Sequence, residues 1–226
     1  SRGADSELVS DTAGVFGKKI AAIASRATKA LKAGHAHVEP MFLSGKVLED
    51  TRDEVVKMVN EWRDGDDFES FETPLLDADW REQQTEFELP LAGLLGQVDE
   101  LRAALAKSTG RALLESGGMH FMRYPVGGTF MLHADEVPEF HEDVRNSISF
   151  LIYLTPDDWT AEDGGALRIF EGREGRTPRD ILPFSGTLVI YDSEVQHEVL
   201  ATKRERHLLS GRFKELNDDW LQRWEH

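Results

Sequence analysis

The chain of 226 residues contains no cysteine, and this absence excludes several kinds of chemistry. No disulfide can form, no thiol can act as a nucleophile, and neither a zinc–thiolate site nor an iron–sulfur cluster can be built. Any bound metal must therefore be held by histidine and carboxylate side chains. Cysteine-free chains occur in every compartment, so the redox environment stays open.

The chain also has no long apolar run and has fewer basic than acidic residues. No stretch approaches the roughly 20 apolar residues that a membrane helix needs, so we expect a soluble protein without a membrane span. The 26 Lys and Arg residues are outnumbered by 42 Asp and Glu, for a net charge of −16. Such a charge repels phosphate backbones, and we expect no nucleic-acid partner. The length and the hydrophobic content of 40% are typical of a single globular domain.

The basic residues that are present gather near the start. Between Thr12 and Val38 there is no acidic residue. Apolar positions recur there at helical spacing, at Phe16, Ile20, Ile23, Ala27 and Leu31. We predict a basic amphipathic helical segment over residues 1–36, followed by a larger domain over residues 37–226. The segment either packs on the flank of that domain or is the remnant of an organelle-targeting sequence. The compartment is thus left open between the cytoplasm and an organelle, and the oligomeric state is unknown. Because the chain begins with Ser1, we expect its native start to lie upstream.

The larger domain divides into a helical part and a β part. Amphipathic helices are predicted from about Gly45 to Trp62 and from about Leu91 to Leu114, as cover for a sheet over residues 45–114. From about 118 to 213 the chain changes to short β-prone runs separated by Gly, Pro and Asp. These runs are Met119–Tyr124, Thr129–His133, Ser147–Leu154, Ala166–Phe170, Thr187–Tyr191, His197–Ala201 and Arg206–Phe213. The pattern predicts a mainly β fold with flanking helices, as a sandwich, barrel or jelly roll.

A metal-binding pattern lies among these strands. His133 and Asp135 are two residues apart, so both side chains point to one face at the end of an extended strand. A short His-x-Asp pattern often arises by chance, but His197 follows a later strand and supplies a second imidazole. Two imidazoles and one carboxylate on one face of an octahedral ion leave three positions open, which suits non-haem Fe(II) chemistry. His141 has no such strand context, and we interpret it as a loop residue.

Two arginines accompany this pattern on the last predicted strand. Alternation places Arg206, Leu208, Ser210 and Arg212 on one face of that strand. An inward guanidinium can hold a carboxylate through two parallel hydrogen bonds, so Arg206 is the candidate anchor for a dicarboxylate. Arg212 is interpreted either as a ligand for a substrate carboxylate or as a partner of a loop acid.

Several blocks of sequence, in order, resemble the Fe(II)- and 2-oxoglutarate-dependent oxygenases, in particular the prolyl 4-hydroxylase group. Nearly half of the chain is involved, from about Gly118 to Phe213. The blocks are Arg123-Tyr124-Pro125-Val126-Gly127-Gly128 before the His133-Ala134-Asp135 motif, Ser149 to Leu154, Asp163 to Phe170 with its Gly-Gly turn, and Pro183 to Asp192 leading to His197 and Arg206.

The resemblance implies a double-stranded β-helix, a jelly-roll and cupin-like core. By matching position, His133, Asp135 and His197 would bind Fe(II) and Arg206 would pair with 2-oxoglutarate. Tyr124 and Tyr153 would donate hydrogen bonds near that carboxylate, or serve as aromatic core, and Ser149 would lie beside the co-substrate. The implied reaction uses O2, with ascorbate as reductant, and hydroxylates an unactivated C–H bond with release of succinate and CO2. The implied partner is a peptide or protein that contains proline.

Some features leave alternatives open. The segment 136–146 is acidic and longer than the resemblance predicts, and we expect this loop to affect substrate choice and to favour basic or neutral peptides. Arg212 stands where the family pattern suggests an aromatic residue. A hydroxylase of a free amino acid or other small molecule is one alternative. A non-catalytic, cupin-like metal-binding protein is another, although it would need no inward arginine. The spacing of Arg206 and Arg212 also occurs in nucleic-acid dealkylases, but the charge of −16 argues against that function.

Overall fold

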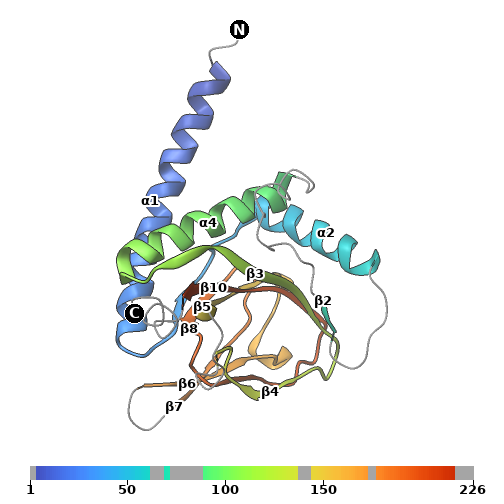
Figure 1. Cartoon of the computed structure of the whole chain (residues 1–226). Coiled ribbons are helices and arrows are strands. Elements are labelled where there is room, and N and C mark those ends of the chain that lie inside the picture. The colour runs from blue at the N-terminus through green and yellow to red at the C-terminus, as the bar shows by residue number, and fades with distance from the viewer. Residues whose placement is uncertain (1–3, 62–68, 72–88, 137–143, 173–176, 217–226) are drawn as a thin grey trace, which may run out of the picture.

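In the computed structural model, three helices lie against one side of a pair of antiparallel sheets (Figure 1). The structure describes residues 4–61, 69–71, 89–136, 144–172 and 177–216. The helices are α1 (Ala4–Lys32), α2 (Gly45–Glu61) and α4 (Leu89–Thr109). Within the described residues, no helix is both long enough and apolar enough to cross a membrane.

The strands form two antiparallel sheets that face each other. The larger sheet has the order β1-β8-β5-β10-β3-β2 and the smaller one the order β4-β9-β6-β7. The larger sheet consists of β1 (His37–Glu39), β2 (Glu69–Phe71), β3 (Leu113–Tyr124), β5 (Val144–Tyr153), β8 (Leu188–Asp192) and β10 (Arg206–Leu216). The smaller one consists of β4 (Phe130–His133), β6 (Leu167–Glu171), β7 (Thr177–Ile181) and β9 (His197–Val199). This is the double-stranded β-helix, so the predicted fold class is confirmed.

Alternation along the central strands separates two apolar clusters. On β5, Ile148, Phe150 and Ile152 belong to the cluster shared with the helices. The intervening residues Leu151 and Tyr153 belong to the cluster between the two sheets. Because successive side chains of a strand point to opposite faces, each central strand fills both clusters. The inner face is therefore the one that can carry a site, while the helices seal the outer face.

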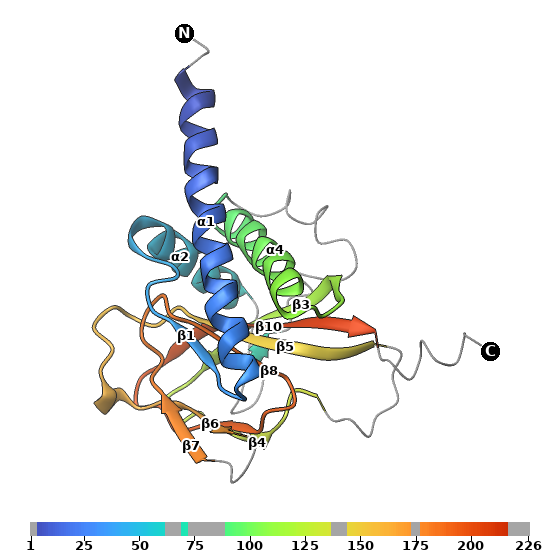
Figure 2. The same cartoon turned by 90° about the vertical axis from the view of Figure 1, so that its left-hand side faces the viewer.

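Helix α1 is part of this outer layer. Its side chains Ile23 and Ala27 are fully buried in the same cluster as Leu101 and Leu105 of α4. Helix α4 lies beside α1 in Figure 2, and Figure 1 shows that it crosses α1 at an angle and continues over the larger sheet. Beside this buried face, the half-exposed Arg26 of α1 forms an ion pair with Glu39 of β1. Residues 20–31 of the predicted basic helix thus pack on the flank of the fold, whereas its N-terminal part projects away from it (Figure 1).

Some predicted boundaries were wrong. The helix expected to reach Leu114 ends at Thr109, because Gly110 adopts a positive φ of 79° and stops it. Strands β1 and β2 have three residues each, too few for an alternation pattern, and were not predicted. Strand β7 was not predicted, because Pro178 and its charged neighbours are not typical of a strand. It lies at the edge of the smaller sheet, where proline is tolerated.

We expect Gly211→Ala to lower the free energy of unfolding by about 1–3 kcal/mol, the usual cost of overpacking a core. Gly211 on β10 lies opposite Phe150, and a Cβ atom at this position would overlap the phenyl ring. Urea denaturation measures the change. Gly93→Ala in α4 is the matched control, because no atom lies within 4 Å of its added Cβ. It should stabilise the protein by about 0.5–1 kcal/mol. Equal effects of the two changes would contradict the packing argument.

Candidate active site

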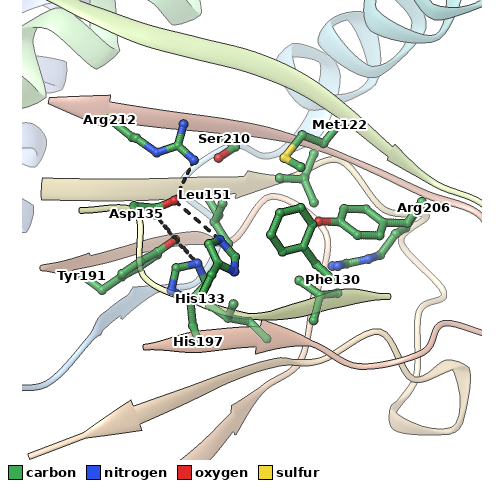
Figure 3. Close-up of a pocket in the computed structure, with 14 residues that line it drawn as sticks. Met122, Phe130, His133, Asp135, Leu151, Tyr191, His197, Arg206, Ser210 and Arg212 are labelled. Atoms are coloured by element: carbon green, nitrogen blue, oxygen red, sulfur yellow. Dashed lines mark hydrogen bonds and ion pairs between the residues drawn. The ribbon is translucent and has the colours of Figure 1, made fainter. Parts of the chain in front are cut away.

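Three side chains predicted as metal ligands meet at the inner face of the smaller sheet (Figure 3). His133 ends β4 and His197 begins β9, and the two residues are direct cross-strand partners. The Nε2 atom of His133 lies 3.7 Å from Asp135 Oδ1, and that of His197 lies 3.8 Å from Asp135 Oδ2. One ligand atom from each residue lies within 4.8 Å of the others, an arrangement that could hold a metal ion.

Both imidazoles are fixed in the orientation that metal binding needs. Nδ1 of His133 lies 2.8 Å from the Met131 carbonyl, and Nδ1 of His197 lies 2.9 Å from the Val195 carbonyl. A carbonyl oxygen only accepts, so each Nδ1 carries a proton and Nε2 is left as the nitrogen that can bind a metal. Burial lowers the pKa of His197, although Asp135 opposes this shift. The neutral form, which is the ligand form, is therefore favoured.

The Asp135 carboxylate is buried, with 4% of its side chain exposed, and each of its oxygens accepts a hydrogen bond. Arg212 Nη2 donates to Oδ1 at 2.6 Å, and the Tyr191 hydroxyl donates to Oδ2 at 3.0 Å. Burial by itself would raise the pKa of Asp135. The neighbouring His133, the Arg212 guanidinium and His197 outweigh burial and hold this pKa well below its usual range. The carboxylate is thus ionised and ready to bind a cation.

Tyr191 was not predicted as a site residue. It is fully buried near the end of β8, and its hydroxyl also lies 3.3 Å from His197 Nε2. Burial and the Asp135 charge raise its pKa well above the usual value, so the hydroxyl stays protonated. The inward alternation of the strand Thr187–Tyr191 was the only sequence signal for it.

Arg206 is the most deeply buried cation of the site, with 1% of its surface exposed. Its guanidinium carbon lies 4.4 Å from the centre of the Tyr124 ring and 5.7 Å from that of Tyr153. Its Nε and Nη1 atoms are buried and have no hydrogen-bond partner among the described residues. The Cβ that Gly165 lacks would lie 3.3 Å from Arg206 Cδ, so this glycine leaves room for the arginine. A buried guanidinium with unpaired N–H groups is costly, and an anionic ligand would relieve that cost.

Of the other three residues predicted to lie near the co-substrate, only Tyr124 lines the pocket; Tyr153 and Ser149 do not. Tyr124 lines the pocket, and burial raises its pKa to about 12 despite the Arg206 charge, so its hydroxyl remains a donor. Tyr153 is fully buried, and its hydroxyl has no partner among the described residues. Ser149 is not among the residues that line the pocket, and its hydroxyl lies 2.8 Å from that of Ser193.

The pocket itself is mainly apolar and carries more positive than negative charge. Its described lining is Met122, Tyr124, Phe130, His133, Asp135, Leu151, Leu167, Tyr191, His197, Val199, Arg206, Leu208, Ser210 and Arg212. The four residues predicted to share one face of β10 all belong to it. Of the two interpretations of Arg212, an acid partner is observed, and this partner is Asp135. Most of the acidic segment 136–146, with His141, lies outside the described residues.

We expect the metal-free protein to lose stability as the pH falls from 7 to 5. Burial lowers the pKa values of His37, His197 and His207 in the folded state. The unfolded chain therefore binds more protons in this range, and stability is complete only above the unfolded pKa of about 6.5. Melting temperatures at a series of pH values measure the effect, and His207→Gln should reduce the slope. A flat profile between pH 7 and 5 would contradict this prediction.

The site geometry agrees with the comparison of the chain with known proteins. Residues 119–214, which carry the three candidate ligands and both arginines, match the sequence model of the 2OG-Fe(II) oxygenase superfamily. This region is thus similar to that superfamily, and the similarity implies Fe(II), 2-oxoglutarate and O2. No curated protein sequence matches the chain.

Solved structures of prolyl hydroxylases are also similar to the chain. A prolyl 4-hydroxylase of Pseudomonas putida is 25% identical with a TM-score of 0.69, covering 88% of this chain and 100% of its own. A Trichoplax adhaerens prolyl hydroxylase was solved with a peptide fragment of the hypoxia-inducible factor oxygen degradation domain. It is 15% identical with a TM-score of 0.69, and the match covers 92% of this chain and 96% of the Trichoplax chain. The 2-oxoglutarate-dependent epimerase SnoN of nogalamycin biosynthesis is 13% identical with a TM-score of 0.59, and the match covers 86% of this chain and 83% of SnoN. The resemblance predicted from the sequence is confirmed.

Proposed function

We propose that the protein is an Fe(II)- and 2-oxoglutarate-dependent hydroxylase that acts on a prolyl residue of a peptide or protein. The observation that carries this proposal is the buried Arg206, whose Nε and Nη1 atoms lack a partner in the described structure. This cation lines the same pocket as His133, Asp135 and His197. A pocket with both features suits a ligand that places one carboxylate on the arginine and chelates the metal with its other end.

Each residue of the pocket has a proposed part. His133 and His197 would hold the iron through Nε2, and Asp135 through its carboxylate. When bound, the iron and its co-substrate supply an oxidative decarboxylation that yields succinate and CO2 and hydroxylates a C–H bond. Arg206 would pair with the C5 carboxylate of 2-oxoglutarate.

The surrounding side chains would support this arrangement. The hydroxyls of Tyr124 and Tyr153 would stand near the C5 carboxylate. The apolar lining residues Leu151, Leu167 and Val199 would exclude water from the reacting centre. We assign no ligand to Ser149, because its hydroxyl is engaged with that of Ser193.

A hydroxylase of a free amino acid is the second candidate. It is favoured by Arg212, whose guanidinium lies beside Asp135 and is partly exposed to the pocket. A cupin-like protein that only binds metal is disfavoured, because such a protein has no use for a second, buried cation at the position of Arg206.

Succinate release from 2-oxoglutarate tests the proposed function. The protein is supplied with Fe(II), O2 and ascorbate as reductant, and challenged with proline-containing peptides, free amino acids and, as a control, methylated oligonucleotides. Stimulation by a proline peptide that gains one oxygen atom in mass spectrometry would support prolyl hydroxylation. Stimulation by a free amino acid would favour the second candidate. An iron-loaded protein that releases no succinate under any of these conditions would overturn both.

A further inference from the structure

Arg212 has hydrogen-bonding capacity that Asp135 does not use. Only its Nη2 atom donates to Asp135, at 2.6 Å. Its Nε atom is buried and has no partner among the described residues. A guanidinium offers five N–H groups and can hold a carboxylate through two of them. About a third of the side chain, 30%, is exposed, at the wall of the same pocket. The arginine could therefore take a second anion without leaving Asp135.

The charges of the pocket indicate that such an anion is missing. Among the described lining residues, Arg206 and Arg212 each carry +1 and Asp135 carries −1, and the two histidines carry no charge when they bind a metal through Nε2. The lining therefore has a net charge of +1. A divalent ion and doubly charged 2-oxoglutarate cancel each other and leave this sum unchanged. Since Arg206 would be paired with the C5 carboxylate, the excess positive charge lies on Arg212. Partly buried charge is stabilised by an opposite charge.

The position of Arg212 limits which part of the substrate can reach it. Its guanidinium is one hydrogen bond away from Asp135, a candidate iron ligand, and on the far side of the metal ligands from Arg206 (Figure 3). An anion bound there would lie beside the candidate metal ligands and so close to the reacting C–H bond. The group would thus belong to the hydroxylated residue or to its immediate neighbour.

We propose that Arg212 binds a carboxylate of the substrate and so makes a nearby carboxylate a requirement for recognition. The inference rests on the proposed function and adds the substrate class. The carboxylate has two sources, the free α-carboxylate of an amino acid or of a C-terminal residue, and the side chain of an adjacent Asp or Glu in a peptide. The inference departs from the expectation that acidic residues at the mouth favour basic peptides, because the described lining carries the opposite charge.

Calorimetric titration of the full-length protein, loaded with Fe(II) and 2-oxoglutarate without oxygen, tests the proposal through binding instead of turnover. The probes are pairs that differ only in the carboxylate: L-proline and L-prolinamide, a capped peptide ending in free proline and its amide, and capped peptides with Pro-Asp and Pro-Asn. In one pair at least, the acid should bind about 10- to 100-fold more tightly, the ratio expected for a charge-assisted hydrogen bond. The pair that shows the ratio identifies the source of the carboxylate.

Arg212→Met should abolish this preference, and Arg212→Lys should retain part of it as a point charge. Arg168→Met is the control, because it removes the same charge from an exposed arginine paired with Asp180 on strand β7 and should keep the full preference. Equal affinity of acids and amides, including no binding of either, or a preference that survives Arg212→Met, would overturn the proposal. The two proposals can fail separately. If 2-oxoglutarate does not bind to the Fe(II)-loaded protein, the proposed function fails; if it binds but acids are not preferred, only the role of Arg212 fails.

Discussion

Replacement of His133 by alanine should remove Fe(II) binding. The change deletes one of three candidate ligands and leaves a carboxylate and one imidazole, which cannot form a facial set. We expect a loss of affinity larger than the roughly 10- to 100-fold that removal of a supporting contact costs at metal sites. Anaerobic calorimetry with Fe(II), or with Mn(II) as a redox-stable probe, measures the affinity directly.

His35→Ala is the matched control for this experiment. His35 is a half-exposed histidine whose Nδ1 atom lies 3.2 Å from Glu171 Oε2, and it does not line the pocket. Its replacement should leave the affinity for Fe(II) unchanged. If His133→Ala bound Fe(II) as tightly as the unchanged protein, the assignment of His133, Asp135 and His197 as ligands would be wrong.

Replacement of Arg206 by methionine should weaken 2-oxoglutarate binding by about 10²-fold or more, since truncation of one partner of a buried charge pair costs about 2–5 kcal/mol. Fe(II) binding should persist, because no candidate ligand is changed. Titration of 2-oxoglutarate into the Fe(II)-loaded variant without oxygen gives the affinity. An unchanged affinity would show that another group anchors the co-substrate.

The same variant should have a second, opposite effect in the absence of ligands. Arg206 is 1% exposed, has two nitrogen atoms without hydrogen-bond partners in the described structure and is contacted by the rings of Tyr124 and Tyr153, so the pocket without ligand holds a cation with no anionic partner among the described residues. Exchange of such a charge for an apolar side chain of similar length should raise the free energy of unfolding by about 1–4 kcal/mol. Thermal or urea unfolding of the ligand-free protein measures this gain.

Arg102→Met provides the contrast. Arg102 is also buried, at 8% exposure, but it donates to Asp99 and to the Leu113 carbonyl. Its loss leaves these acceptors without a donor and should destabilise the protein. Stabilisation by Arg206→Met together with destabilisation by Arg102→Met would separate a residue kept for ligand binding from one kept for structure. Destabilisation by both would contradict the view that Arg206 lacks an internal partner.

The similar structures show why the substrate must be argued from the site. Prolyl hydroxylases and the epimerase SnoN have the same fold as this chain at TM-scores of 0.59–0.69. A shared double-stranded β-helix therefore does not select a substrate or even a reaction. In this pocket two polar side chains, Arg212 of β10 and Tyr191 of β8, hold Asp135.

The sequence by itself determined the local features of the site. The two-residue spacing of His133 and Asp135 places both side chains on one face of an extended segment. The same alternation correctly placed Arg206 and Arg212 on the pocket face of β10. Seven of the ten strands in the described part of the chain, β3 to β6 and β8 to β10, were predicted, because each lies in a β-prone run bounded by turn residues. All of these features follow from backbone geometry within one strand.

Only the tertiary structure decided which of these side chains meet. The ion pair between Arg212 and Asp135, the hydrogen bond from Tyr191 and the engagement of Ser149 by Ser193 each join residues from different segments of the chain. The short strands β1 and β2 likewise exist through their partners in the sheet. Such contacts depend on strand register and on the approach of two sheets, which no periodicity within a single strand can specify.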